Sequence, residues 1–302
     1  MLTLLTIFFK KQVRRDIIMN SRSLKKYFPI FVLPTLIAFI IAFVIPFVMG
    51  IYLSFCKFNT IRDATFVGIK NYVYILTKDQ NFINALLRTT KFTIISVILI
   101  NVGAFALALL LTKKIPGTNI FRTIFFMPNL IGGLVLGFIW REILNTVFLK
   151  TTGRPMTYTG ADYGFWGLLV VMCWQLMGYM MIIYIAGIQN IPEDVLEAAK
   201  IDGATPFQIL YKITIPLVMP SVTICLFLTI SNSFKLYDQN YALNGISPKT
   251  NLVALDIYNT FYNGSSPYSE GRAQAKAVIF FLIVACITFA QLRLTRSKEV
   301  ES

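Results

Sequence analysis

Residues 192–220 read PEDVLEAAKIDGATPFQILYKITIPLVMP, a polar segment between two long apolar runs. Pro192 suits the first position of a helix, and acidic residues follow where the helix dipole favours negative charge. Gly203 predicts the end of that helix, because glycine readily takes the left-handed conformation of a C-terminal cap. Thr205 predicts the N-cap of a second helix, with Pro206 at its first position and a glutamine at the capping-box spacing. The segment therefore predicts two short helices joined by a sharp bend, which is an arrangement suited to docking a cytoplasmic partner.

The same segment carries the residues of a known motif. The triplet EAA at 197–199 is followed by Gly203 and, after nine intervening residues, by ITIP at 213–216. This spacing resembles the E-A-A-x-x-x-G-x(9)-I-x-L-P loop of ABC importer permeases, with Ile215 in place of the usual leucine. The alternative is a surface helix that only joins two spans. The resemblance implies a loop that couples the membrane domain to an ATP-binding subunit through Glu197, Ala198, Ala199, Asp202, Gly203 and Pro206.

The composition indicates a polytopic membrane protein. The 302 residues are 56% hydrophobic and 14% charged, and their mean hydropathy is +0.66, too apolar for a soluble domain of this length. The four cysteines lack the spacing of a metal site, and they predict no disulfide framework. Histidine and the phosphate-binding GxxxxGK(S/T) loop are both absent from the sequence. We therefore expect no metal or cofactor in this chain, and we expect another chain to hydrolyse ATP.

The strong positive charge of the chain indicates how it is located and oriented in the cell. A net charge of +14 fits nucleic-acid binding in a soluble protein. In so apolar a chain it instead indicates membrane orientation and contact with anionic lipid. Residues 1–28 are rich in lysine and arginine and show no small-residue cleavage site before the basic run. We therefore expect a basic cytoplasmic tail on the membrane surface, with no secretory signal, followed by a transmembrane domain over residues 29–302.

Six apolar segments approach the ~20 residues that cross a bilayer. They are residues 29–54, 92–111, 121–143, 165–189, 214–236 and 274–293. The sequence thus predicts an all-α membrane protein with about six transmembrane helices. Prolines are expected to bend the first span, and the Gly133 and Gly137 pair permits close helix approach in the third. The basic tail and the basic link at 112–122 place both termini and the 190–212 loop in the cytoplasm, in a multi-pass plasma-membrane protein.

Two long segments are expected on the outer side. Residues 56–91 mix aromatic, amide and charged side chains, and they are expected to include a helix lying at the membrane surface. Residues 237–272 carry several turn signals, including Asn244-Gly245 and Asn263-Gly264. A loop of this length is often functional.

Polar side chains in the fourth and fifth predicted spans are candidates for solute binding. Four residues of the fifth span share one helical face, and at ~1.5 Å per residue they lie roughly as deep as those of the fourth. Amides, hydroxyls and aromatic faces suit an uncharged, hydroxyl-rich ligand. The alternative is that the polar groups join helices and that the aromatic rings anchor the membrane interface. The candidates are Trp174, Gln175 and Tyr179 in the fourth span and Thr229, Asn232, Ser233 and Leu236 in the fifth.

A second resemblance narrows the substrate class. The pattern W-x(4)-Y-M-M at 174–181, followed by the EAA loop, is similar to the sugar-importer branch of these permeases, in particular the maltose-type subunit. The resemblance implies that the spans on either side of the EAA loop contact a carbohydrate. It also implies a second, homologous permease, two ATP-binding subunits and an extracellular solute-binding protein as partners. The chain itself would be a transporter subunit and not an enzyme.

Other functions remain as alternatives. Within the same class, an importer of glycerol-phosphate or amino acids would want a basic residue in its cavity, and Lys235 is the candidate for that residue. A secondary transporter or channel would favour inverted repeats or buried carboxylates, and Glu142 and Asp238 both lie near span ends. A membrane-embedded enzyme would need a cluster of His, Asp or Glu within the spans.

Overall fold

The computed structural model describes residues 28, 30–113, 116–156, 161–247 and 249–299, so the predicted tail over residues 1–28 lies almost wholly outside it. The chain divides into two parts, residues 1–53 and 54–302, which are described separately here. Apart from turns, the described residues are helical except for a short antiparallel hairpin, in which β1 (Cys56–Lys57) pairs with β2 (Thr65–Phe66).

The first part contains one apolar helix, which begins at Ile30 and continues to Ser54. It includes a π-helical turn, η1 (Ile40–Val44), followed by α2 (Ile45–Ser54). The Ile45 N–H bonds to the carbonyl of Ile40, five residues back, directly before Pro46. Because proline has no N–H to donate, the ladder of hydrogen bonds changes spacing there. The structure thus shows a local change of helical pitch before Pro46, whereas the predicted bend of this span stays a prediction.

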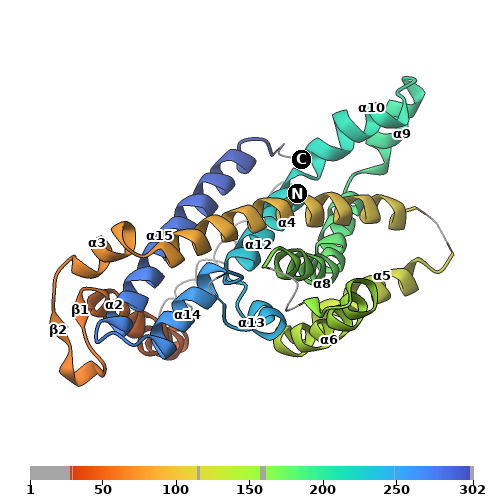
Figure 1. The fold of residues 1–302 in the computed structure, drawn as a ribbon. Helices are drawn as coiled ribbons and strands as arrows, with labels where there is room; N and C mark the ends of the chain where they lie inside the picture. Colours follow the sequence, from red (N-terminus) through yellow and green to blue (C-terminus); the bar gives the residue numbers. More distant parts are fainter. Residues whose placement is uncertain (1–27, 29, 114–115, 157–160, 248, 300–302) are drawn as a thin grey trace, which may run out of the picture. The chain divides into compact units, whose positions relative to one another are not determined.

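The second part holds the remaining helices. In chain order they are η2 (Ile61–Asp63), α3 (Lys70–Thr77), α4 (Gln80–Leu111), α5 (Thr118–Phe126), η3 (Met127–Leu130), α6 (Gly133–Thr152), α8 (Ala161–Gln189), α9 (Glu193–Ile201), α10 (Pro206–Ile209), η4 (Leu210–Thr214), α11 (Ile215–Leu217), α12 (Met219–Phe234), α13 (Asp238–Asn244), α14 (Val253–Asn263) and α15 (Ser269–Arg296). The labels are those of Figure 1.

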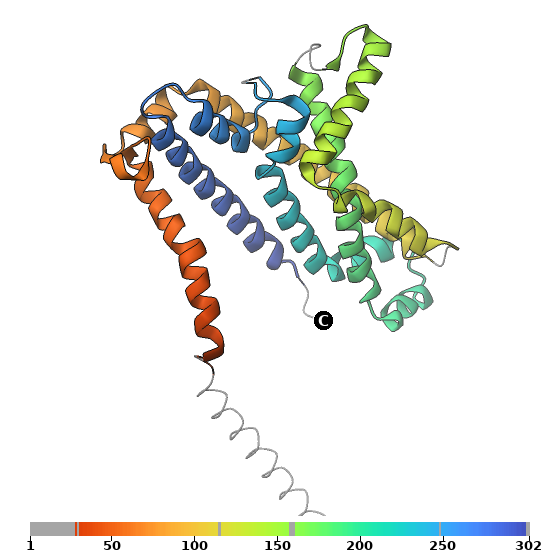
Figure 2. The same ribbon diagram turned by 90° about the horizontal axis from the view of Figure 1, so that it is seen from below.

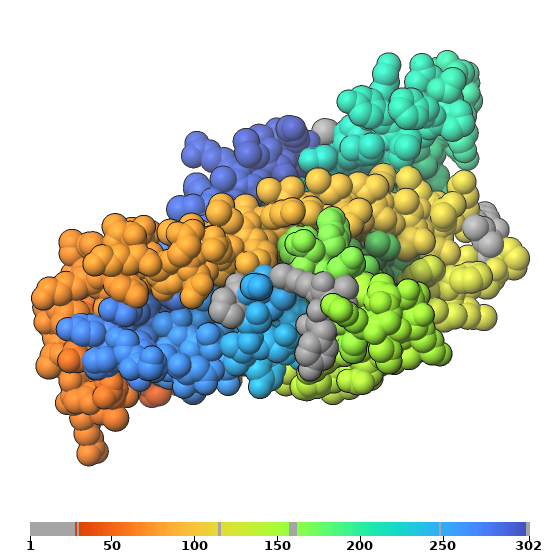
Figure 3. Space-filling model, viewed as in Figure 1, coloured from red at the N-terminus to blue at the C-terminus, as the bar shows by residue number. Residues whose placement is uncertain are grey.

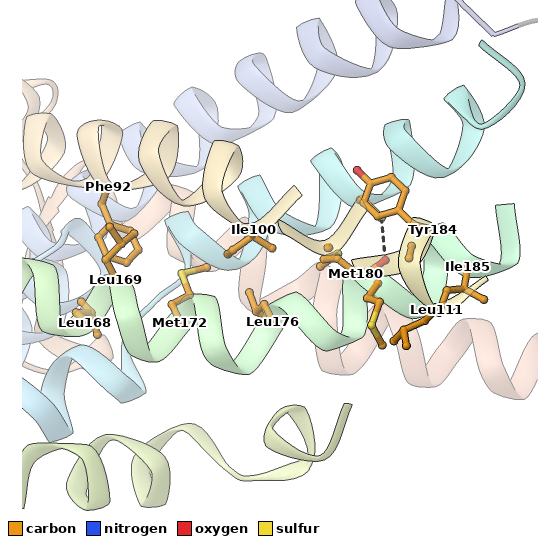
Figure 4. Packing of buried hydrophobic residues seen from close by; sticks show 14 of the residues in the cluster. Phe92, Ile100, Leu111, Leu168, Leu169, Met172, Leu176, Met180, Tyr184 and Ile185 are labelled. Carbon is orange, nitrogen blue, oxygen red and sulfur yellow. Dashed lines mark hydrogen bonds between the residues drawn. The ribbon is translucent and has the colours of Figure 1, made fainter. Parts of the chain in front are cut away.

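The core of this part forms where α8 packs along α4, and α12 packs against both α4 and α15. Every fourth residue of α8 points into the core, because residues four apart share one helical face. These buried side chains are Leu168, Met172, Leu176, Met180 and Tyr184. They meet Phe92 and Ile100 of α4 (Figure 4). The predicted Gly133 and Gly137 pair also gives close approach, since α13 packs on it and a Cβ on Gly137 would lie 2.6 Å from that of Ala242.

The predicted spans are confirmed in number only when bent helices are counted. Among the described residues, four helices are long and apolar enough to cross a membrane, and two bent pairs raise the number to as many as six. The predicted third span, 121–143, is wrong as one helix: residues 118–130 and 133–152 meet at 100°. The chain becomes extended at Ile131 and Gly132, just after Pro128. The fifth is also bent, by 68°, where α11 gives way to α12.

The two ends of the second part differ in character. The helices α9 and α10 lie at one end, together with the end of α15 (Figures 1 and 2). There Thr223 of α12 donates a hydrogen bond to Glu299 Oε1 at 2.7 Å. The helices α3, α13 and α14 lie at the opposite end (Figure 2). Residues 237–272, predicted as an outer loop with turn signals, therefore contain two helices.

Candidate functional site

The α9–α10 loop has the local structure that the sequence predicts. Helix α9 begins at Glu193, one residue later than expected, and Pro192 is its N-cap. Gly203 has a φ of +79°, and the Ala204 N–H bonds back to the carbonyl of Ala199 at 3.0 Å, which closes the helix. Thr205 and Gln208 form a reciprocal capping box, with N···O distances of 2.7 and 3.3 Å. The bend is therefore held by backbone conformation and by both side chains.

The loop is also well exposed, and it projects from the body of the second part in Figure 3. Ile201, Phe207 and Tyr211 are 86%, 74% and 66% exposed, and the two rings stack with centroids 6.4 Å apart. The acidic side chains of Glu193, Asp194 and Glu197 are exposed beside them. Exposed apolar side chains rimmed by charge are typical of a protein–protein contact.

A polar cavity of about 240 Å³ lies where α6, α8, α12 and α13 meet. Of the predicted substrate residues, it brings together Gln175, Asn232 and Leu236. The other lining residues are Gly133, Met172, Leu176, Lys235, Tyr237, Asp238 and Gln239. Of the residues that were predicted to face each other from the fourth and fifth spans, three thus line one cavity.

Hydrogen bonds fix the amides of this cavity. Gln175 donates to the carbonyl of Ile131 at 2.9 Å, in the break between η3 and α6. Gln239 in turn donates to Gln175 Oε1. Its own Oε1 is buried and accepts no hydrogen bond from any residue that the structure describes. A buried acceptor without a donor costs free energy.

Thr229 and Ser233 lie in helix packing and do not line the cavity. Both are fully buried where α12 meets α4. Ser233 Oγ and Ser96 Oγ are hydrogen-bonded at 2.8 Å. Asn101 donates to Thr229 Oγ1 at 3.3 Å and accepts from the Tyr184 hydroxyl at 2.8 Å. The four residues predicted to share one helical face are therefore divided. Helix α4 covers Thr229 and Ser233, whereas Asn232 and Leu236 line the cavity.

Trp174 and Tyr179 lie on other surfaces of α8. Trp174 is half exposed and packs edge-on against Trp140 of α6, with ring centroids 5.5 Å apart. Tyr179 packs against Phe126, at the end of α5. Neither ring lines the polar cavity. The structure thus separates the aromatic and the amide members of the predicted site.

Comparison with known proteins identifies the chain. Residues 104–300 match the family described as binding-protein-dependent transport system inner membrane component. The chain belongs to this family. The permease is therefore a membrane transport component and not an enzyme, as the sequence predicts.

The relatives extend the match over most of the permease. It is 44% identical to the probable starch degradation products transport system permease protein AmyD of Thermoanaerobacterium thermosulfurigenes, over 90% of this chain and 94% of the relative. It is 28% identical to the multiple sugar-binding transport system permease protein MsmF of Streptococcus mutans, over 89% and 95%. A crystal structure of a bacterial ABC transporter that imports the acidic polysaccharide alginate has the same fold, with a TM-score of 0.76, 19% identity, and coverage of 91% and 98%.

The permease contains a buried charge cluster that the sequence analysis missed. Lys276, 2% exposed in α15, lies 2.9 Å from Asp79 Oδ2 and 2.7 Å from Asp256 Oδ2. It also donates to Thr260 Oγ1 at 2.8 Å. Burial raises the pKa of the Asp256 carboxyl above its ordinary value, and the Lys276 ammonium opposes that shift. A lysine at the third position of the predicted span 274–293 was the available signal, because such a charge needs a partner.

Proposed function

We propose that the permease forms, together with a second and similar permease, the translocation path of an ATP-driven importer of uncharged oligosaccharides. The relatives named for starch degradation products and for multiple sugars support this substrate class. In the complete importer, an extracellular solute-binding protein would deliver the sugar, and two ATP-binding subunits would supply the energy. The observation that carries the proposal is the cavity lined by the amide residues Gln175, Asn232 and Gln239.

The chemistry of the cavity favours a neutral ligand. Amides from Gln175, Asn232 and Gln239 offer both donors and acceptors, which a sugar hydroxyl can satisfy in either direction. Lys235 and Asp238 line the same cavity and carry opposite charges. Their charges balance, so the cavity has no excess of positive charge for glycerol-phosphate. The proposed substrate contacts are therefore Gln175, Asn232, Leu236 and Gln239. Trp174 and Tyr179 would provide aromatic surfaces beside the cavity. Thr229 and Ser233 would affect the substrate only indirectly, by holding α12 in place.

The α9–α10 loop is the proposed contact with the ATP-binding subunit. Its exposed Ile201, Phe207 and Tyr211 would enter an apolar groove of that subunit. Glu197 would meet a basic residue at the rim, with Ala198, Ala199 and Asp202 beside it. Closure of the two ATP-binding subunits would then push on residues 193–211. The spans would alternate between inward-open and outward-open states.

This assignment requires the loop and both termini to face the cytoplasm of a plasma-membrane protein. The end of α15 lies beside the start of α12, which follows the loop, so the C-terminus and the loop share a side. Green fluorescent protein fused after Ser302 should be fluorescent, and alkaline phosphatase fused there should be inactive. The reverse result would contradict the orientation.

Uptake by the reconstituted complex tests the cavity. Asn232→Leu and Gln239→Leu should each reduce uptake of labelled maltotriose, because each leaves sugar groups unpaired at a cost of about 1–3 kcal/mol, or roughly 5- to 100-fold. Leu282→Ala, a change at an exposed position of α15, is the matched control. All three variants should keep the basal rate of ATP hydrolysis. Normal uptake by both cavity variants, or uptake of glycerol-3-phosphate and not of maltotriose, would overturn the proposal.

A further inference from the structure

A second cavity, of about 420 Å³, lies at the end of the permease opposite the α9–α10 loop. It is an open hollow, lined by the connection between α12 and α13, by α14 and by the first turns of α15. Its lining contains no Asp, Glu, Lys or Arg among the described residues. The lining residues are Tyr237, Ala254, Ile257, Tyr258, Phe261, Tyr262, Ala273, Gln274 and Ala277. A volume of this size is ordinary for a small-molecule site, for which the usual range is roughly 300–1,000 Å³.

Aromatic rings form a continuous series along this cavity. The rings of Tyr241 and Tyr237 stack 5.9 Å apart, Tyr237 and Tyr258 lie 5.0 Å apart, and Tyr258 and Tyr262 lie 4.6 Å apart. Phe261 extends the series, with its ring 5.0 Å from that of Tyr262. Partial burial, and then the neighbouring Tyr258, raises the pKa of Tyr237 to about 12, so its hydroxyl stays neutral at physiological pH.

The series leads from the surface to the polar cavity. Tyr262 is 67% exposed, so its ring is not part of the packed core. Tyr237, at the other end, lines both the aromatic cavity and the amide-lined cavity. The two cavities therefore adjoin each other at this one side chain.

We propose that this tyrosine series is a binding site for the trailing units of a linear, uncharged oligosaccharide whose leading unit occupies the amide-lined cavity. A sugar ring presents an apolar C–H face and a hydroxyl edge. A tyrosine presents a flat apolar face and a hydroxyl, so successive tyrosines match successive units. This inference rests on the proposed function, since it assigns a second site to the same substrate.

Chain-length dependence of uptake tests the site in the complete complex, with one solute-binding protein throughout. The variant is Tyr258→Leu, which keeps apolar volume but removes the central ring. Uptake of each member of the series from maltose to maltoheptaose is measured below saturation. We expect uptake of maltoheptaose to fall roughly three- to tenfold, as loss of an aromatic contact implies, and uptake of maltose to change by less than about twofold.

Two controls separate the ring from its surroundings. Tyr258→Phe keeps the ring but loses the hydroxyl, so it should retain more of the maltoheptaose uptake than Tyr258→Leu. Phe289→Leu makes the same kind of change at an exposed ring farther along α15, and it should behave as wild type. Complex level and basal ATP hydrolysis are measured for every variant, so that a fold defect is recognised.

The outcomes distinguish the two proposals. If wild type takes up the series but Tyr258→Leu alters every length equally or none, the tyrosines serve only as an interfacial anchor and this inference fails alone. If the wild-type complex takes up no member of the series, the proposed function fails as well.

Discussion

Lys276 shows how one side chain can set the stability of a whole end of the molecule. Its ammonium lies between two carboxylates from α14 and from the residue before α4, and all three groups are largely buried. Lys276→Met should destabilise the permease by about 3–5 kcal/mol, because it removes the ammonium that is paired with two buried carboxylates. Thermal unfolding in detergent measures the loss, and Lys276→Arg, which keeps the charge, should lose less.

The same substitution has a predicted pH dependence. Burial raises the pKa of Asp256 in the folded protein above its value in the unfolded chain, so the folded state binds a proton at this carboxyl more tightly. The contribution of Asp256 to stability therefore falls as the pH rises through its pKa in the folded state. Removing Lys276 takes away the opposing attraction and raises that pKa further. The stability deficit of Lys276→Met should therefore be smaller near pH 5 than near pH 8. An equal deficit at both pH values would contradict this account.

Individual site residues could be predicted from helical spacing only where they lie within one continuous helix. Asn232 and Leu236 were found because they share a face, and Gln175 because a polar group in a span needs a cavity or a partner. Gln239 continues the same spacing, but α12 ends at Phe234 and a new helix begins at Asp238, so periodicity alone could not extend the face. Thr229 satisfies the same rule and yet faces α4, because helical spacing does not tell which neighbour a face meets.

At the scale of elements, the bend between α9 and α10 depends on one backbone conformation. Gly203→Val should disturb the helix pair, since a side chain at positive φ costs about 1–2 kcal/mol and more when β-branched. The variant should still insert in the membrane but lose substrate-stimulated ATP hydrolysis. Gly203→Asn, which tolerates this conformation, should retain most of it. Co-purification of the ATP-binding subunit with each variant measures the docking directly.

For the long apolar helices, existence was predictable from the sequence, whereas the ends were not. The second predicted span begins at residue 92, but α4 begins at Gln80, where Asp79 Oδ1 accepts from the Phe82 N–H at 3.0 Å. Hydropathy marks where a helix is apolar, and capping marks where it starts, so the polar first turns were left out. The break after Pro128 was hidden for the opposite reason, since the residues on both sides are apolar. An apolar run is equally compatible with one helix or with two.

At the scale of the whole molecule, a few buried hydrogen bonds limit how the helices can move during transport. Asn101 donates to Thr229 and accepts from Tyr184, and Ser96 is hydrogen-bonded to Ser233. These hydrogen bonds tie α4, α8 and α12 together at points that water does not reach. Sliding one helix past another would break them without replacement, so these three helices should turn as a single rigid body. Spin labels at Val102 and Ile224, both on exposed surfaces, should keep one separation in the nucleotide-free and ATP-bound complexes. A label pair between Val102 and the second permease should report the motion instead. If the first distance changes as much as the second, transport works by sliding helices, and the shared hydrogen bonds must exchange partners in every cycle.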